Sequence, residues 1–214
     1  KKIVFFNSRI NQDFIDDLSP GKNNDLFQNF FSEQEGLHKT ITPVYIQDIC
    51  HEIIGLVKEP CETLKITIEK ELKKCKKCIV EKDKIKLALL NIVFNSMEAL
   101  GFNGRIMIAV SETVFKDSNC TMVDGLCVSI SDTGPGISES DINKIFLPYF
   151  TTKTERLGLG LAVAQRVVHK HQGLITCEAN PSQGTTMSVY LPYTRSIKQK
   201  NTIKNTSEKR VLAK

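Results

Sequence analysis

The order in which apolar side chains change their spacing along this chain is the feature that most limits its fold. Three stretches have the three- and four-residue spacing of amphipathic helices: 44–58, 84–100 and 159–171. Five shorter stretches have the alternation of strands: 64–72, 105–115, 126–132, 174–179 and 185–192. Helices mixed with turn-linked strand pairs favour an α+β fold. We expect a two-layer α/β sandwich, with helices covering one face of a mixed, mostly antiparallel sheet.

The segments on either side of this pattern divide the chain into three parts. Apolar residues spaced by three and four along 3–18, and a second cluster at 26–31, predict a helical N-terminal segment over residues 1–40. Residues 41–193 then form the main domain, whose first helix we expect to begin at Pro43. A further short helix is expected over residues 141–145. Residues 194–214 hold seven basic residues and one acidic residue, and we expect a flexible tail.

Net charge and hydropathy narrow the classes of partner. The formal net charge is +5, and the tail alone carries +6, so the rest of the chain is close to neutral. We therefore expect no nucleic-acid interface, because such a domain gathers its basic residues on the folded surface. No apolar run approaches the roughly 18 residues of a membrane helix, so we expect no membrane contact by this segment.

The cysteines indicate a reducing compartment. There are seven, an odd and mostly scattered set, which argues for a cytoplasmic location rather than a disulfide framework. Cys75 and Cys78 have C-x-x-C spacing, but no further pair supplies the other two ligands of a structural zinc site. We interpret them as two thiols in a solvated, lysine-rich segment.

Two amides four residues apart lie inside the most apolar predicted helix. Asn91 and Asn95 share one helical face, and buried amides are costly unless they find a partner. Carboxamide oxygens can hold a hard cation such as Mg²⁺ or its waters, since this ion takes oxygen ligands and keeps several waters beside phosphates. An asparagine on an apolar helix can equally serve a neighbouring backbone group, so the pair alone decides nothing.

Three glycine-containing turns follow along the chain. Asp132 ends a predicted strand, and the glycines after it, Gly134 and Gly136, let a ligand approach; a carboxylate there suits the exocyclic amine of a planar base. The run 157–162, Leu-Gly-Leu-Gly-Leu-Ala, leads into a helix whose free N–H groups and positive end attract phosphate. The stretch 184–186, Gly-Thr-Thr, precedes the last strand. Each of these alone also fits an ordinary turn or hairpin.

In this order the motifs resemble the N, G1, F, G2 and G3 boxes of the ATP-binding domain of sensor histidine kinases. The F box corresponds to residues 146–153, Phe-Leu-Pro-Tyr-Phe-Thr-Thr-Lys, and the resemblance covers residues 42–192. Short-lid kinases of the nitrogen-regulatory type look most similar. The resemblance implies the Bergerat-type fold that gyrase, the Hsp90 chaperones and MutL share, with ATP and Mg²⁺ bound. It also implies a cytoplasmic protein-histidine kinase domain of a two-component system, whose intact protein can be membrane-anchored.

Carried over position by position, the resemblance implies a role for each matching residue. Asn95 matches the Mg²⁺ ligand, and the implied catalytic positions are Asn91, one turn earlier, and Lys153, a lid residue near the terminal phosphates. Asp132 matches the adenine-binding carboxylate, and Thr185 reaches the same base. The remaining implied nucleotide contacts are Glu98, Ala99, Gly134, Gly136, Ile137, Tyr149, Leu157, Gly158, Leu159, Gly160 and Leu161.

The amide at position 91 separates kinases from hydrolases within this resemblance. The hydrolysing members place a glutamate four residues before the Mg²⁺ asparagine, where a carboxylate can activate water as a general base. Asn91 cannot accept a proton near pH 7, which favours phosphoryl transfer by positioning and charge neutralisation. Two alternatives stay open: an ATPase of the same fold, and an anti-sigma-type serine kinase or nucleotide-sensing regulatory module.

The resemblance also implies an acceptor and partners. The stretch 51–55, His-Glu-Ile-Ile-Gly, is similar to a phosphoacceptor box, but His51 lies only 44 positions before Asn95, too few for an acceptor hairpin. We therefore expect the acceptor histidine in a dimerisation hairpin largely absent from this chain, of which residues 1–40 would be a remnant. The implied partners are this hairpin, a second copy of the intact kinase and the receiver domain of a response regulator.

Overall fold

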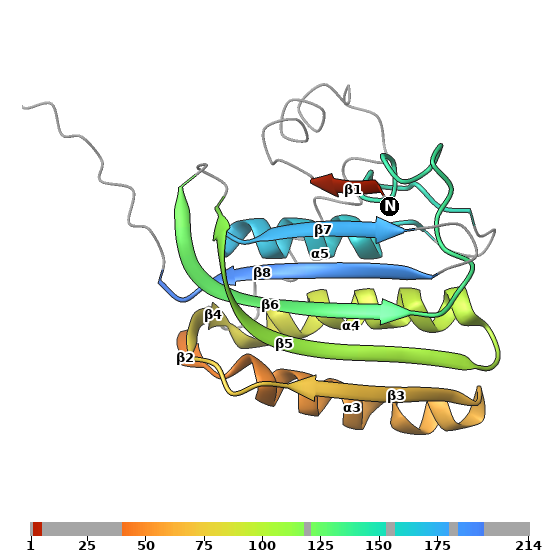
Figure 1. Cartoon of the computed structure of the whole chain (residues 1–214), viewed down its shortest axis with the longest axis horizontal. Helices are drawn as coiled ribbons and strands as arrows, with labels where there is room; N and C mark the ends of the chain where they lie inside the picture. Colours follow the sequence, from red (N-terminus) through yellow and green to blue (C-terminus); the bar gives the residue numbers. More distant parts are fainter. Residues whose placement is uncertain (1, 6–39, 118–120, 153–156, 180–183, 195–214) are drawn as a thin grey trace, which may run out of the picture.

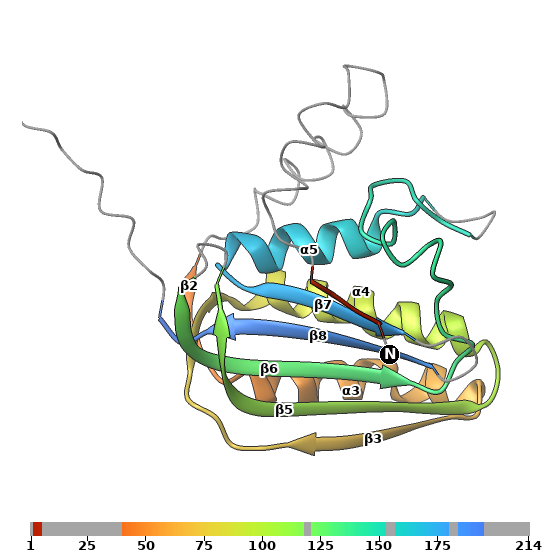
Figure 2. The same ribbon diagram turned by 45° about the horizontal axis from the view of Figure 1, so that its top comes forward.

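The structure is a computed structural model that describes residues 2–5, 40–117, 121–152, 157–179 and 184–194. They form two layers (Figure 1), of which one is a six-stranded sheet in the order β1-β7-β8-β6-β5-β3. The helices of the described residues cover one face of this sheet (Figure 2). They are α3 (Ile46–Thr63), α4 (Lys82–Leu100) and α5 (Gly160–Lys170). This architecture confirms the expected α+β sandwich.

The sheet is mixed, as expected, because only one pair of its strands is parallel. Its members are β1 (Lys2–Phe5), β3 (Ile66–Leu72), β5 (Gly104–Lys116), β6 (Met122–Asp132), β7 (Leu174–Ala179) and β8 (Thr185–Pro192). Strands β3 and β5 run parallel at one edge, and the other neighbours are antiparallel. A separate antiparallel ribbon joins β2 (Ile41–Val44) to β4 (Cys78–Glu81) near the start of α4 (Figure 1).

Alternation along the central strands decides which side chains meet the helices. On β6, Leu126, Val128 and Ile130 are buried and join the core, while the intervening Cys127 and Ser129 are half-exposed. The helix layer completes the core with apolar side chains, of which a Leu, Ile, Val or Met contributes roughly 1.5–3 kcal/mol when fully buried. Those from α4 are Ile85, Ala88, Leu89, Ile92, Val93 and Met97. The same alternation continues to Asp132, the last residue of β6, so the Asp132 carboxylate also lies on the side of the sheet that the helices cover.

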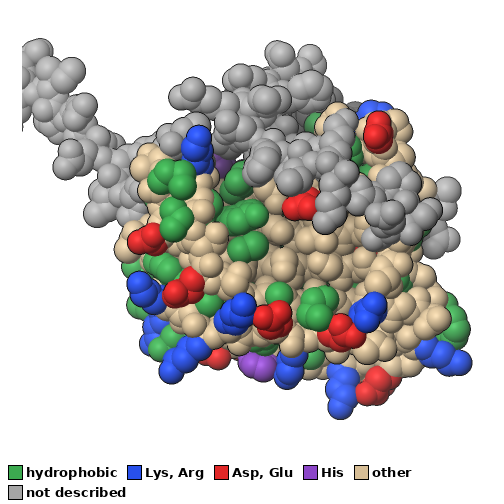
Figure 3. Space-filling view, in the orientation of Figure 1, with side chains coloured by type: hydrophobic (Ala, Val, Ile, Leu, Met, Phe, Trp, Pro, Cys, Tyr) green, Lys and Arg blue, Asp and Glu red, His purple; other side chains and the backbone are tan. Residues whose placement is uncertain are grey.

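No helix of the described residues covers the opposite face of the sheet. This face carries small polar side chains on its central strands, such as Ser131 and Thr186, whose hydroxyl oxygens lie 2.9 Å apart. Figure 3 looks onto it and shows scattered hydrophobic side chains, with basic and acidic side chains interspersed along the lower edge. Such a mixture is ordinary for a solvated surface. No helix of the described residues is long and apolar enough to cross a membrane.

The structure corrects the expectation for the first residues of the chain. Residues 2–5 form a strand rather than the start of a helix, with Val4 opposite Cys177 of β7. The run Ile-Val-Phe suits a strand, and the edge of β7 offers backbone groups to pair with. Residues 6–39 and 195–214 lie outside the described residues, so the helical N-terminal segment and the flexible tail stay predictions for those stretches.

Two other local expectations were also wrong. Pro43 lies in β2 opposite Ile79, and the helix begins only at Ile46, because an edge strand tolerates a residue without an N–H. Residues 141–145 form turns rather than a helix. The N–H groups of residues 141 and 142 both reach the carbonyl oxygen of Ser138, at 3.2 and 3.0 Å, and that of Lys144 reaches residue 141, so no regular helical ladder develops.

The C-x-x-C segment is the last correction. Cys75 and Cys78 are 4% and 0% exposed. Both thiols are therefore buried, whereas the sequence predicted a solvated segment. The Cys75 thiol donates to the carbonyl oxygen of Lys73 at 3.3 Å, and Cys78 opens β4 opposite Val44. Sequence alternation failed to show β4 because this strand has only four residues. Within the described residues no group of three or more His, Cys, Asp and Glu side chains could hold a metal ion.

Candidate functional site

Asp132 is a carboxylate held in a fixed orientation at the end of β6. Its side chain is buried, and Oδ1 accepts the backbone N–H of Gly134 at 2.9 Å and of Thr185 at 3.3 Å. No hydrogen bond from the described residues reaches Oδ2. A carboxylate with one oxygen occupied by main-chain donors and the other open can accept a hydrogen bond from an amine of a ligand.

The turn after β6 closes against the end of α4. A Cβ added at Gly134 would lie 2.9 Å from Oδ1 of Asp132 and 3.5 Å from the Cβ of Ala99, so only glycine fits without displacing the carboxylate. Gly136 has a positive φ of 78°, and Ile137 packs on the core. Thr185 faces the turn from β8, since it is opposite Asp132 in the register. The turn therefore joins the sheet to the helix layer beside the carboxylate.

The two amides of α4 lie on the side of the helix that faces this region. Asn91 is half-buried, and Asn95 and Ala99 are exposed. A Cβ added at Gly160 would come 3.3 Å from Oδ1 of Asn91, so the first residue of α5 lies directly against this amide. Glu98, half-buried, is one turn beyond Asn95. Because residues four apart share a helical face, Asn91, Asn95 and Ala99 form one wall that runs from α5 to the turn after β6.

The start of α5 presents backbone donors. Leu159 is its N-cap with no side-chain cap hydrogen bond, and the first turn contains no acidic residue. The first N–H groups of a helix have no partner within it, and they carry the positive end of the helix dipole. These groups can bind anionic oxygens, and they lie next to the Asn91 amide.

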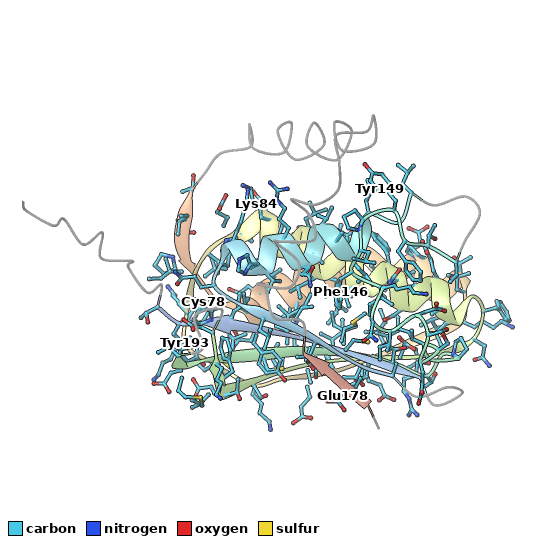
Figure 4. All side chains as sticks on the ribbon, turned by 90° about the horizontal axis from the view of Figure 1, so that it is seen from above. Cys78, Lys84, Phe146, Tyr149, Glu178 and Tyr193 are labelled. Atoms are coloured by element: carbon cyan, nitrogen blue, oxygen red, sulfur yellow. The ribbon has the colours of Figure 1, made fainter. Side chains whose placement is uncertain are left out.

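The loop before α5 is fixed by a close approach of two backbones. Gly158 has a φ of 67° and accepts the N–H of Tyr149 at 3.1 Å, and Tyr149 itself has a φ of 65°. Figure 4 shows Tyr149 on the rim of this loop, away from the sheet, with Phe146 nearer to the sheet. Phe146 is 2% exposed and anchors the loop in the core, whereas Leu157 is 74% exposed. Lys153 lies outside the described residues.

One residue of this region was missed from the sequence. Cys177 of β7 is fully buried, and burial raises its pKa to about 12, with the negative charge of Asp132 as the next cause. It lies two strands away from β6 across β8, opposite Met187, while Asp132 is opposite Thr185 of the same strand. Only the strand order reveals this neighbour, because 45 residues separate the two in the sequence.

Comparison with known proteins decides the family. Residues 80–195, more than half of the chain, match the family described as "Histidine kinase-, DNA gyrase B-, and HSP90-like ATPase". This chain belongs to that family. The family is one of ATPases, so this chain carries a nucleotide-binding domain, and the resemblance found in the motifs is confirmed.

Individual relatives point to the kinase branch of the family. Sensor histidine kinase ZraS of Salmonella typhimurium is 30% identical over 159 residues, which are 72% of this chain and 32% of ZraS. The chain thus spans about a third of that relative. The catalytic domain of histidine kinase ThkA has a TM-score of 0.63 at 29% identity and covers 72% of this chain and 96% of its own. The structure of ThkA in complex with the response regulator protein TrrA has a TM-score of 0.59 at 26% identity. The match covers 83% of this chain and 52% of that chain.

Proposed function

We propose that this chain is the catalytic, ATP-binding part of a two-component sensor histidine kinase. In the intact protein it would transfer the γ-phosphate of ATP to a histidine of a dimerisation hairpin. The observation that carries the proposal is the approach of three features: the Asp132 carboxylate, the amide-bearing wall of α4 and the start of α5. Relatives named sensor histidine kinases support this reaction over the others of the family.

The sheet end supplies recognition of the base. Oδ1 of Asp132 is held by the N–H groups of Gly134 and Thr185, which leaves Oδ2 to accept the exocyclic amine of adenine. Because Gly134 lacks a side chain and lies beside Ala99, the base can lie close to the backbone between the turn and α4. Ile137 and Tyr149, both partly buried, supply apolar surface to the same region.

The helix layer supplies the contacts to phosphate. The N–H groups at the start of α5 and the backbone of Gly158 would bind phosphate oxygens, and Lys153 would neutralise the terminal phosphate. Asn95 fits Mg²⁺, since it is exposed on the wall of α4 and offers an amide oxygen. Bound Mg²⁺ would offset the negative charge that builds up on the transferred group. Glu98, Leu159 and Leu161 complete the proposed contacts.

Asn91 favours transfer over hydrolysis. It is half-buried beside Gly160, where the reacting phosphate would lie, and an amide cannot take a proton from water near pH 7. The acceptor would therefore be a histidine brought by the hairpin of the intact kinase, acting as a homodimer in the cytoplasm. The ThkA–TrrA complex supports a receiver domain as the next partner in the phosphorelay.

The proposal is tested by titrating the chain with a non-hydrolysable ATP analogue in the presence and absence of Mg²⁺. Asp132→Asn keeps an oxygen for the two N–H groups but presents an amide to the adenine amine. We expect at least about a tenfold loss of affinity, since a hydrogen bond to a charged group is worth about 1.5–3 kcal/mol. The matched control is Asp124→Asn on the same strand, whose side chain is exposed far from the site.

Asn95→Ala provides the second arm of this test. The variant should lose most of the gain in affinity that Mg²⁺ gives the parent chain, while its binding without Mg²⁺ stays within about twofold. If Asp132→Asn and Asp124→Asn bind the analogue equally well, the base pocket is elsewhere. If Asn95→Ala keeps the full effect of Mg²⁺, the metal assignment is wrong.

A further inference from the structure

His171 is a buried imidazole that the proposed chemistry does not use. It lies at the C-terminal end of α5 and is 1% exposed. Its Nδ1 is 2.8 Å from the carbonyl oxygen of Val167, and its Nε2 is 3.0 Å from the backbone N of Glu81. A carbonyl oxygen only accepts and a backbone N–H only donates. The ring is therefore neutral with its proton on Nδ1, and Nε2 accepts from Glu81.

Glu81 connects His171 to two elements, because it is both the last residue of β4 and the N-cap of α4. Its carboxylate pairs with Lys84 at 2.9 Å and lies 3.9 Å from Nε2 of His171. The hydrogen bond from the Glu81 N–H thus connects the C-cap of α5 to the N-cap of α4. The two helices are antiparallel, and farther along them Gly160 of α5 lies beside Asn91 of α4, whose Oδ1 would be 3.3 Å from a Cβ added at Gly160.

The two contacts fix the position of one helix along the other. They are 10 residues apart on α4 and 11 apart on α5, which at about 1.5 Å per residue are spans of about 15 and 16 Å. An α-helix is stiff over such a length, so holding its last turn also sets the axial position of its first turn. A shift of α5 by about 1 Å would move its N–H groups relative to the amides of α4, a change large enough to affect a reaction.

We infer that His171 is a positioning residue for the phosphate half of the nucleotide site. It fixes the start of α5 against Asn91 and Asn95 through its hydrogen bond from Glu81, about 15 Å along the helix from Asn91. The inference rests on the proposed nucleotide site. His171 has no such role for the half of the site that binds the base. Asp132 and the two backbone groups that donate to it belong to β6, β8 and the turn after β6.

Two substitutions separate the two hydrogen bonds of the ring. His171→Gln places an amide oxygen where Nε2 was, so the bond from the Glu81 N–H is kept and the bond to Val167 is lost. His171→Asn places an amide NH₂ where Nδ1 was, so the bond to Val167 is kept and the bond between the helices is lost. Each variant loses one hydrogen bond of similar strength, which makes them a matched pair for stability.

The full chain and both variants are titrated with adenosine and with the Mg²⁺ complex of a non-hydrolysable ATP analogue. We expect His171→Asn to weaken binding of the analogue by about three- to tenfold and to leave the affinity for adenosine within about twofold. His171→Gln should resemble the parent with both ligands. Equal losses with both ligands, or the same loss in both variants, would mean that the histidine only stabilises the fold and would overturn the inference.

A second pair of variants serves if His171→Asn does not fold. Glu81→Pro removes the N–H without touching α5, and the φ of −82° at this position is close to that of proline. Glu81→Ala keeps the N–H and removes the same side chain. The proline variant alone should lose affinity for the ATP analogue, and no difference between the two overturns the inference. Failure of the parent chain to bind adenosine or the analogue would instead reject the proposed function itself.

Discussion

Gly158, in the loop before α5, has a backbone conformation that excludes a side chain. Its φ of 67° and a distance of 2.7 Å from an added Cβ to the carbonyl carbon of Tyr149 exclude a side chain. We expect Gly158→Ala to lower the free energy of unfolding by roughly 1–3 kcal/mol, through strain at a left-handed position. Affinity for the ATP analogue should fall as well, because the loop leads directly into α5. Urea unfolding and the titration described above measure the two effects.

Gly55 offers a matched control for this substitution. It lies within α3, and nothing is within 4 Å of an added Cβ. Gly55→Ala should raise the free energy of unfolding by about 0.5–1 kcal/mol, since alanine loses less conformational entropy in a helix. It should leave nucleotide affinity unchanged. A Gly158→Ala variant as stable as the parent would show that the loop adopts another conformation in solution.

Asn91 is where the choice between transfer and hydrolysis can be tested. Asn91→Glu introduces a carboxylate beside the start of α5, and we expect steady phosphate release to rise at least about tenfold, since a positioned general base contributes about 10²–10⁴-fold. Asn91→Gln introduces a side chain as long as that of glutamate but without a basic group, so phosphate release should not rise in this variant. Phosphate release from ATP measures both. A rise of the same size in the two variants would show that the longer side chain, not the base, admits water.

At the scale of elements, periodicity predicted the long helices and strands well. The stretch 84–100 corresponds to α4 and 159–171 to α5, because each has a full apolar stripe to bury. The short ribbon of β2 and β4 was missed, since four residues show too little alternation and Pro43 suggested a helix start. The strand β1 differs from the expected helix because spacings of three and four are ambiguous over a few residues.

The site residues divide in the same way. Asp132, Gly134 and Gly160 could be proposed from the sequence because each lies in a motif local in sequence, and the structure places them beside the wall of α4. Cys177 and His171 could not, because their neighbours come from strand order and from the packing of one helix on another. Contacts between distant segments depend on tertiary structure, which a single sequence does not display.

The pairing of α3 with α4 is an element-scale feature that titrates. Glu52 of α3 accepts hydrogen bonds from Lys82 at 2.5 Å and Lys86 at 2.8 Å, and these bonds lower its pKa, with the bond from Lys82 as the largest cause. A carboxyl whose pKa is lowered by folding adds stability above its unfolded pKa, here 4.5, and loses it as pH falls through the folded value. The side chain is 37% exposed, so solvent screening keeps the effect small.

We therefore expect Glu52→Gln to lower the Tm by up to about 3 °C near neutral pH. The difference from the parent should shrink as the pH is lowered below 4.5, because the parent then loses the same charge. Thermal unfolding by circular dichroism across pH 3–8 follows this. Glu59→Gln, an exposed position of the same helix with no ion pair among the described residues, is the control. A pH-independent difference would assign the effect to packing instead.

At the scale of the whole molecule, three buried thiols from different elements of the core make stability depend on pH. Cys50 of α3, Cys78 of β4 and Cys177 of β7 are all at most 1% exposed, and burial raises the pKa of each from 9.0 to about 12. In the unfolded chain these thiols lose their protons near pH 9. A group whose pKa is raised by folding contributes fully below its unfolded pKa, and this contribution is lost as pH rises from about 9 to about 12.

The fold should therefore lose stability steeply in alkali, and one thiol can be isolated by difference. Cys50→Ala and Cys50→Ser remove the proton at position 50, so the free energy of unfolding should fall less steeply between pH 9 and 11, by up to about 1.4 kcal/mol per pH unit. Tyrosines and lysines also titrate here, but they are the same in parent and variants. The two variants will differ in absolute stability, because serine adds a buried hydroxyl, yet their slopes should agree. Urea unfolding at several pH values under reducing conditions measures the slopes, and a slope equal to that of the parent would show that Cys50 ionises in the folded core as readily as in the unfolded chain.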